Sequence, residues 1–162
     1  MTTTNSRYEP VRRKRLNTAQ RMAVYEKCQG HCAYCGEPLP FKKMQVDHIT
    51  PIELAHLARA EGNDVNHPDN LLPACRPCNY IKSTLVLEKF RNMIAGWPDT
   101  LERDSTTYRN VVRFGVVEPK PHRITFYFEQ IGYKAPDYAA GYHEMLRQIR
   151  ERAMEAQDES EK

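Results

Sequence analysis

Two identical cysteine pairs place the strongest constraint on how this 162-residue chain can fold. Cys32-x-x-Cys35 and Cys75-x-x-Cys78 are separated by 39 residues. A two-residue gap lets a tight turn direct both sulfurs at one ion, and four thiolates complete the tetrahedral coordination that Zn²⁺ prefers. We therefore predict a structural zinc site that ties together two segments far apart in the sequence. The alternative, four buried and reduced cysteines, must explain two equally spaced pairs by coincidence.

The number of cysteines also bears on the compartment. Five are too few and too clustered for a secreted disulfide scaffold, and an odd number leaves one unpaired. That one, Cys28, is close enough to Cys32 to compete as a ligand, but we expect it on a helix face. The first 16 residues hold no apolar run of signal-peptide type, and no segment approaches the ~20 apolar residues of a membrane span. A cytoplasmic protein without a membrane partner is predicted.

The positive charge of the chain is concentrated near its amino terminus. The net charge is only +3, yet residues 1–30 hold seven Lys or Arg against two Asp or Glu. The cluster Arg12, Arg13, Lys14 and Arg15 is suited to a polyanion such as nucleic acid. The alternative is a solvated, flexible terminus. Residues 151–162 are acidic and offset much of this charge.

The remaining patterns predict helices interrupted by short strands. Asn17 and Gln20 form a capping-box-like start for the first helix. Alternating apolar residues predict strands at 44–48 and 124–128, and an extended segment at 71–75. Further helices are predicted over 52–60, from 79 through 94, over 101–114 and over 138–162. We divide the chain into a flexible basic arm (1–16), a core (17–97), a helix-and-strand extension (98–137) and an acidic helical tail (138–162).

Several motifs in this order resemble the HNH nuclease family, also called ββα-metal or His-Me finger nucleases. They are Cys32-Ala33-Tyr34-Cys35-Gly36, Val46-Asp47-His48-Ile49-Thr50-Pro51, Asp69-Asn70-Leu71 and Cys75-Arg76-Pro77-Cys78-Asn79-Tyr80-Ile81-Lys82. The resemblance covers about residues 19–94, and the segments 112–115 and 126–129 look like those of small phage and prophage HNH proteins. It implies an α+β fold, in which a ββα-metal core is stapled by the four-cysteine zinc site and flanked by helices and a short carboxy-terminal β segment.

The resemblance also implies roles for four side chains. His48 would be the general base that takes a proton from the attacking water, and Asn70 would brace the loop and orient that base. Asp47 and Asn79 would hold the catalytic cation through oxygen atoms. Many family members have a histidine at the position of Asn79, and the amide favours Mg²⁺ or Mn²⁺ over softer cations.

Lys82 and Arg76 are the expected phosphate contacts outside the basic arm. Lys82, one turn after Asn79, would hold a phosphate as a point charge. The alternative for both residues is a solvated charge on the helix surface, and for Arg76 this alternative is the favoured interpretation. The gap between His48 and Asn70 holds 21 residues, 49–69, and predicts an inserted helix that either shapes the DNA channel or is a neutral elaboration.

The function predicted from these residues is a metal-dependent DNA endonuclease, nicking or cutting both strands. A non-catalytic zinc module that binds nucleic acid or protein fits the cysteines and the basic arm equally well, but does not need Asp47, His48, Asn70 and Asn79. A third alternative is a phage packaging nuclease that acts only beside a terminase. The partners expected are DNA and, as alternatives, a second copy of the chain or phage packaging proteins.

Overall fold

The structure is a computed structural model that describes residues 11–119 and 123–160. Its regular elements are β1 (Gln45–His48), β2 (Leu71–Ala74), α1 (Thr18–Glu26), α2 (Ala55–Ala60), α3 (Arg76–Lys82), α4 (Leu87–Ala95), α5 (Trp97–Asp104), α6 (Thr106–Arg113), α7 (Tyr127–Gln130) and α8 (Ala140–Ser160), with 3₁₀ turns at Phe41–Lys43, Ile52–Leu54 and Pro68–Asn70. The predicted α+β class, with an antiparallel strand pair and flanking helices, is confirmed. Among the described helices, none combines the length and apolar character needed to cross a bilayer.

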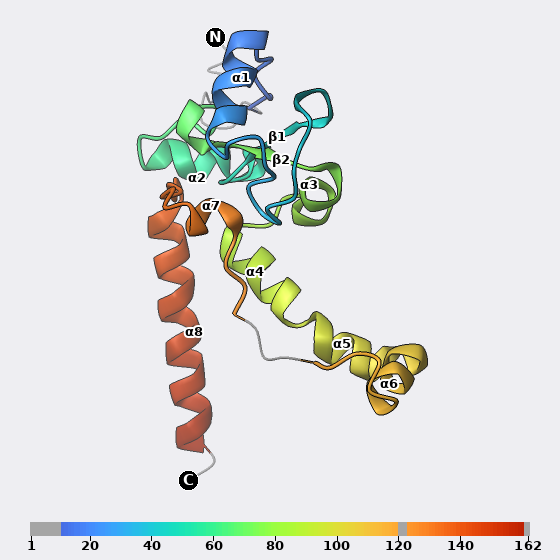
Figure 1. Ribbon diagram of the computed structural model, residues 1–162. Helices are drawn as coiled ribbons and strands as arrows, with labels where there is room; N and C mark the ends of the chain where they lie inside the picture. The colour runs from blue at the N-terminus through green and yellow to red at the C-terminus, as the bar shows by residue number, and fades with distance from the viewer. Residues whose placement is uncertain (1–10, 120–122, 161–162) are drawn as a thin grey trace.

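The centre of the molecule is the strand pair followed by α3. The antiparallel register places Asp47 opposite Leu72 and His48 opposite Leu71. Residue Cys75 is extended, and Pro77 occupies the first turn of α3, where its missing N–H costs no helical hydrogen bond. The helix therefore starts directly after β2, contacts β1 and completes a ββα unit (Figure 1).

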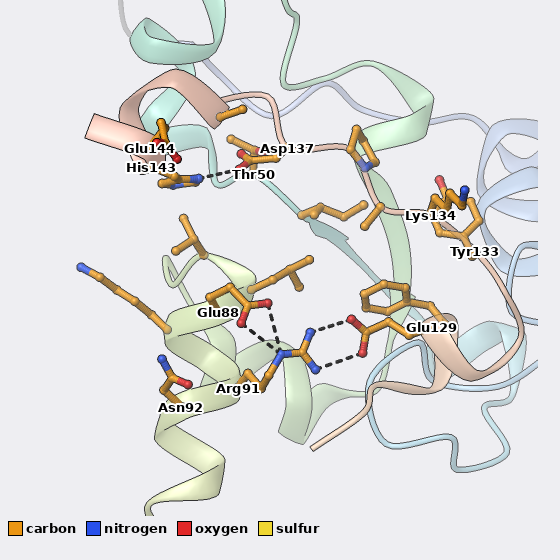
Figure 2. Close-up of a pocket in the computed structure, with 18 of the residues that line it drawn as sticks. Thr50, Glu88, Arg91, Asn92, Glu129, Tyr133, Lys134, Asp137, His143 and Glu144 are labelled. Carbon is orange, nitrogen blue, oxygen red and sulfur yellow. Dashed lines mark hydrogen bonds and ion pairs between the residues drawn. The ribbon is translucent and has the colours of Figure 1, made fainter. Parts of the chain in front are cut away.

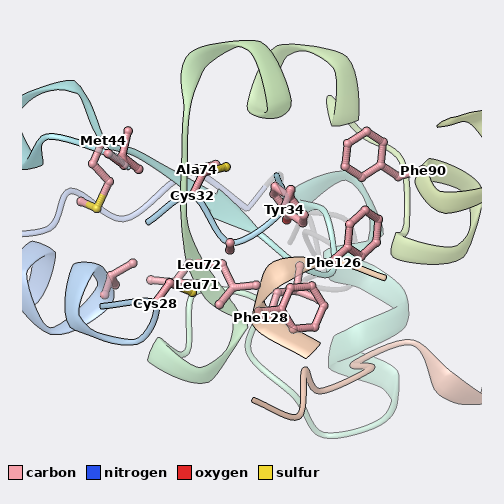
Figure 3. Packing of buried hydrophobic residues seen from close by; sticks show 14 residues of the cluster. Cys28, Cys32, Tyr34, Met44, Leu71, Leu72, Ala74, Phe90, Phe126 and Phe128 are labelled. Atoms are coloured by element: carbon pink, nitrogen blue, oxygen red, sulfur yellow. The ribbon is translucent and has the colours of Figure 1, made fainter. Parts of the chain in front are cut away.

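The aromatic core joins the amino-terminal and carboxy-terminal parts of the chain. Tyr34 packs edge-on against Phe90, Phe126 and Phe128, with ring centroids 5.4, 5.4 and 6.3 Å away (Figure 3). All four rings are buried. Because Phe126 and Phe128 lie in the segment predicted as a separate extension, that segment contributes to the central core.

The predicted strand over 124–128 is not observed, which corrects the carboxy-terminal β segment. Burial does alternate there, but the backbone finds no strand partner: the N–H groups of Tyr127 and Phe128 donate to the carbonyls of Tyr34 and Ala33. The chain then turns into α7, whose first turn is closed by Glu129 accepting from the N–H of Phe126. The alternation of buried residues over 124–128 thus results from packing against the turn that carries Cys32 and Cys35, and not from strand pairing.

Two predicted helices are divided in the structure. The helical spacing from 79 through 94 is interrupted at Ser83, whose φ of 47° lies in the left-handed region, so α3 and α4 are separate. The predicted helix 101–114 is divided at Ser105, which is extended and caps α6. The first helix is capped by Asn17 and Gln20 as predicted, and 138–162 is helical over Ala140–Ser160. Figure 1 shows α8 and the run α4–α5–α6 extending from the same side of the ββα unit.

Candidate metal centre and nuclease site

The four cysteines of the two pairs converge in the structure. All four Sγ atoms lie within 4.8 Å of one another, and the Sγ atoms of Cys35 and Cys75 are 3.9 Å apart. Zn–S bonds of about 2.3 Å in a tetrahedron place sulfurs about 3.8 Å apart, so the donor set and its spacing fit zinc. Cys32 and Cys35 come from the turn after α1, and Cys75 and Cys78 from the junction of β2 with α3.

The first knuckle depends on a glycine and on a bond to the second strand. Gly36 has φ of 74°, and a Cβ atom there would lie 3.1 Å from the ring of Tyr127. The N–H of Ala33 donates to the carbonyl of Pro73 at 2.8 Å. The turn is thereby attached to β2, which brings both cysteine pairs to one place.

The pKa values of two thiols in the cysteine cluster are shifted in opposite directions. The thiol of Cys78 donates to Cys32 and lowers the pKa of Cys32 to about 4, while burial raises the pKa of Cys35 to about 11. Metal binding requires deprotonated thiols and therefore releases protons from this cluster. The fifth cysteine, Cys28, is fully buried in the core and is not part of the cluster. Burial raises its pKa to about 11, as expected for a packed thiol rather than a ligand.

Asp47 is buried on β1 and is engaged by two donors. The ammonium of Lys82 lies 2.9 Å from its Oδ2 atom, and the hydroxyl of Tyr34 donates to the same oxygen. Desolvation first, and then the charge of Asp47, raise the pKa of Tyr34 well above its usual range. Both contacts fall on the same carboxylate oxygen, Oδ2.

The structure places Lys82 differently from the sequence prediction. Its side chain is fully buried, and its Nζ atom also donates to the carbonyl of His48 at 2.8 Å. An ammonium held in this way cannot reach a phosphate in solution without breaking both contacts. Lys82 instead neutralises Asp47 and fastens α3 to the end of β1.

His48 ends β1 and is 5% exposed. Its Nε2 atom is 3.2 Å from Oδ1 of Asn66, and its Nδ1 atom is buried without a hydrogen bond to any described residue. Burial lowers the pKa of His48, and the positive charge of Arg13 contributes to that lowering. The imidazole is therefore neutral near pH 7, which is the form that can accept a proton.

Asn70 makes the contacts that a loop brace requires. Its Oδ1 atom accepts from the N–H of Thr50 at 2.8 Å, and its Nδ2 atom donates to the carbonyls of Thr50 and Val65 at 2.9 and 2.7 Å. The backbone carbonyl of Asn70 also accepts from Ile49, the residue after His48. The buried amide thereby closes both ends of the inserted segment beside the base.

Asn79 faces β1 from α3. Its Nδ2 atom donates to Oε1 of Gln45 at 2.7 Å. Gln45 and Asp47 are two residues apart on a strand and so share one face. Asn79 therefore contacts the strand that carries Asp47, and amide and carboxylate oxygens are the donor types that a hard cation such as Mg²⁺ prefers.

The basic residues remain on the surface. Arg76 and the four arm residues Arg12, Arg13, Lys14 and Arg15 are exposed. Residues 1–10 of the predicted arm lie outside the described part of the chain. Two backbone groups of the arm form hydrogen bonds with Asn66. No pattern in the sequence predicts this role for Asn66, nor the contacts of Tyr34 with Asp47 and of Gln45 with Asn79.

A separate cavity of about 930 Å³ lies between α4, the segment before α8 and α8 (Figure 2). Among the lining residues, Arg91 pairs with Glu129 at 2.6 Å and with Glu88 at 3.1 Å. At its other end His143 Nδ1 is 2.7 Å from Asp137 Oδ2. None of the predicted nuclease residues lines this cavity.

Comparison with known proteins identifies the segment that carries this site. The HNH endonuclease family model matches residues 32–84. The CRISPR-associated endonuclease Cas9 of Corynebacterium diphtheriae is 39% identical over 57 residues, which are 35% of this chain and 4% of that protein. The crystal structure of the Type II-C Cas9 enzyme from Actinomyces naeslundii overlaps 51% of this chain and 8% of its own, with 22% identity and a TM-score of 0.38. Residues 32–84, which lie within the stretch 19–94 that carries the motifs, are thus similar to an HNH endonuclease domain.

Proposed function

We propose that this protein is a metal-dependent DNA endonuclease that hydrolyses phosphodiester bonds beside β1 and α3. The observation that carries the proposal is His48, a neutral, buried imidazole with one ring nitrogen left without a hydrogen bond to the described residues. Such a group can take a proton from an attacking water. The similarity of residues 32–84 to an HNH endonuclease domain supports phosphodiester hydrolysis as the reaction class, because HNH nucleases act on nucleic acid.

Asp47 and Asn79 would hold the catalytic cation, Mg²⁺ or Mn²⁺, through one oxygen each. When bound, the cation would stabilise negative charge on the phosphoryl group and on the leaving 3′ oxygen. Gln45 holds the amide of Asn79 by accepting from its Nδ2 atom. Lys82 and Tyr34 hold the carboxylate of Asp47 in place, since both donate to Oδ2. The zinc in the cysteine cluster would be structural and distinct from this cation.

DNA would be bound chiefly through its phosphates. The four arm residues at 12–15 are exposed, and the backbone of residues 12 and 14 is attached to the loop beside His48. Affinity should therefore fall as salt rises, because each neutralised phosphate releases counterions. Arg76 is exposed and could add a contact, whereas buried Lys82 is assigned to Asp47.

A supercoiled-plasmid assay tests the proposal. Zinc-loaded protein is incubated with plasmid with and without Mg²⁺ or Mn²⁺; omitting the cation is preferable to chelation, which would also attack the cysteine cluster. Cleavage should require the cation and fall by roughly 10²–10⁴-fold in His48→Ala, the range that general-base catalysis supplies. Asn79→Ala should need more Mg²⁺ for half-maximal rate. Undiminished cleavage by a zinc-loaded His48→Ala protein would overturn the assignment of the base.

A non-catalytic zinc module is the second candidate, and the burial of the site favours it. Asp47 and His48 are only 2% and 5% exposed, which is unusual for groups that must meet a substrate. A module of this kind would bind DNA or protein with no cation-dependent cleavage. The same plasmid assay distinguishes the two functions, provided that DNA binding is measured on the same samples.

A further inference from the structure

Asn66, in the inserted loop, contacts His48 and two backbone groups of the amino-terminal arm. Its Oδ1 atom lies 3.2 Å from His48 Nε2 and 3.2 Å from the backbone nitrogen of Lys14. Its Nδ2 atom donates to the carbonyl of Arg12 at 3.2 Å. Its own backbone N–H donates to Oδ1 of Asp64 at 2.9 Å, which fixes the loop from which the side chain projects.

These contacts determine which way the amide faces. A backbone N–H can only donate, so the Lys14 nitrogen must face the amide oxygen. A carbonyl can only accept, so Arg12 must face the amide nitrogen. Rotating the amide by half a turn would place its NH₂ group against the N–H of Lys14 and its oxygen against the carbonyl of Arg12, and neither pair can form a hydrogen bond. The oxygen of Asn66 is therefore the atom presented to His48.

The orientation of Asn66 in turn determines the tautomer of His48. A neutral imidazole has one N–H and one lone pair. Because Nε2 faces an oxygen that can only accept, Nε2 carries the hydrogen, and Nδ1 carries the lone pair. Nδ1 is also the nitrogen that is buried without a hydrogen bond to the described residues.

We propose that Asn66 is a positioning residue for the nuclease reaction: it holds His48 in the Nε2–H tautomer, so that Nδ1 accepts the proton of the attacking water. This inference rests on the proposed function. Asn66 touches neither substrate nor cation in this scheme and acts only through His48. The arm has a part in it as well, because the backbone of residues 12 and 14 sets the orientation of the amide, in addition to the phosphate contacts of its side chains.

Two variants of Asn66 separate positioning from simple structural support. Asn66→Ala removes the acceptor, whereas Asn66→Asp keeps an oxygen facing Nε2. Both are assayed as full-length, zinc-loaded protein, with zinc content and thermal unfolding as checks on folding. Asn66→Ala should lower kcat roughly 10- to 100-fold with KM little changed, a part of what a general base supplies. Asn66→Asp should recover most of kcat. An Asn66→Ala protein with wild-type kcat, or an Asn66→Asp protein as slow as Asn66→Ala, would overturn the proposal.

A spectroscopic readout makes the test independent of cleavage. Nitrogen-15 NMR of the histidine rings distinguishes a protonated ring nitrogen from one with a lone pair, and the His48 signals are assigned by their loss in His48→Ala. Wild type should show a protonated Nε2, and Asn66→Ala should show a mixture of tautomers. A wild-type spectrum with protonated Nδ1 would overturn the proposal. If wild type does not cleave DNA at all, the proposed function fails, while the spectrum still decides whether Asn66 sets the tautomer.

The contribution of the arm backbone is tested at Lys14. Lys14→Ala removes the charge and keeps the N–H that donates to Asn66, whereas Lys14→Pro removes both. Lys14→Ala should raise KM at moderate salt, and Lys14→Pro should in addition lower kcat and disturb the His48 tautomer. Equal kcat values for the two variants would remove the arm from the positioning scheme.

Discussion

Four sulfurs from one turn and from the junction of β2 with α3 form the cysteine cluster, whereas the surroundings of His48 come from the arm, β1, the inserted loop and α3. The cluster repeats one sequence spacing with one type of donor, so the sequence is enough to infer it. The His48 site joins unlike side chains, and several of its contacts have no sequence signal. The two regions meet at Tyr34, which lies between Cys32 and Cys35 and donates to Asp47. A repeated spacing of identical residues can therefore be recognised in the sequence, whereas the packing of unlike side chains around His48 cannot.

Removal of metal from the cysteine cluster is expected to have the largest effect. Zinc binding in small zinc domains contributes on the order of 10–16 kcal/mol at pH 7, comparable with the whole stability of a typical domain. Cys75→Ser should lose bound zinc and its cooperative melting transition, measured by circular dichroism and metal analysis. Cys28→Ala is the matched control and should keep about one zinc per chain. A Cys75→Ser protein with unchanged melting would show that the cluster is not a folding element.

Substitution of Lys82 is expected to have the second largest effect on stability. Lys82→Met leaves Asp47 buried without its cationic partner, which costs about 3–5 kcal/mol of unfolding free energy. Arg76→Met, on the exposed start of the same helix, should change it by less than about 0.5 kcal/mol. Urea denaturation measures both. If Lys82→Met is as stable as wild type and its DNA affinity depends less on salt, the side chain contacts phosphate after all.

Loss of the Asn70 amide should lower the free energy of unfolding by less than the substitution of Lys82 does. Asn70→Ala leaves three buried backbone groups without their partner, and we expect a loss of about 1–3 kcal/mol in urea denaturation. Asn63→Ala, whose amide makes a single hydrogen bond of 3.5 Å, is the control and should lose less. Equal losses in the two variants would argue against a bracing role for Asn70.

The smallest expected effect is the pH dependence contributed by His48. Its pKa in the folded protein is lowered from the ordinary value of 6.5, so the unfolded chain binds the proton more readily. His48 should therefore reduce stability as the pH falls below about 6.5, down to its folded pKa, and have no effect above that window. Urea denaturation of wild type and His48→Gln at several pH values, without added Mg²⁺, measures the difference. Parallel pH profiles for the two proteins would contradict the lowered pKa.

Local patterns predicted much of the fold correctly. Asn17 and Gln20 start the first helix, alternation marks β1, and the helix predicted over 52–60 is observed as a 3₁₀ turn followed by α2. The same reasoning was wrong at 124–128, because the alternation of buried residues there reflects packing of Phe126 and Phe128 against the first cysteine turn. It also missed the break at Ser105, where the capping side chain interrupts an otherwise helical pattern.

The sequence by itself determined the ligands of the cysteine cluster, the order of β1, β2 and α3, and the residues that carry the nuclease motif, because each depends on spacing within a short stretch. Only the tertiary structure decided the environment of those residues. It buried Lys82 against Asp47, placed the oxygen of Asn66 on His48 and attached the arm to the same amide. These outcomes follow from which side chains meet when distant segments pack, and the desolvation and hydrogen-bond direction that result are not properties of any local stretch of the chain.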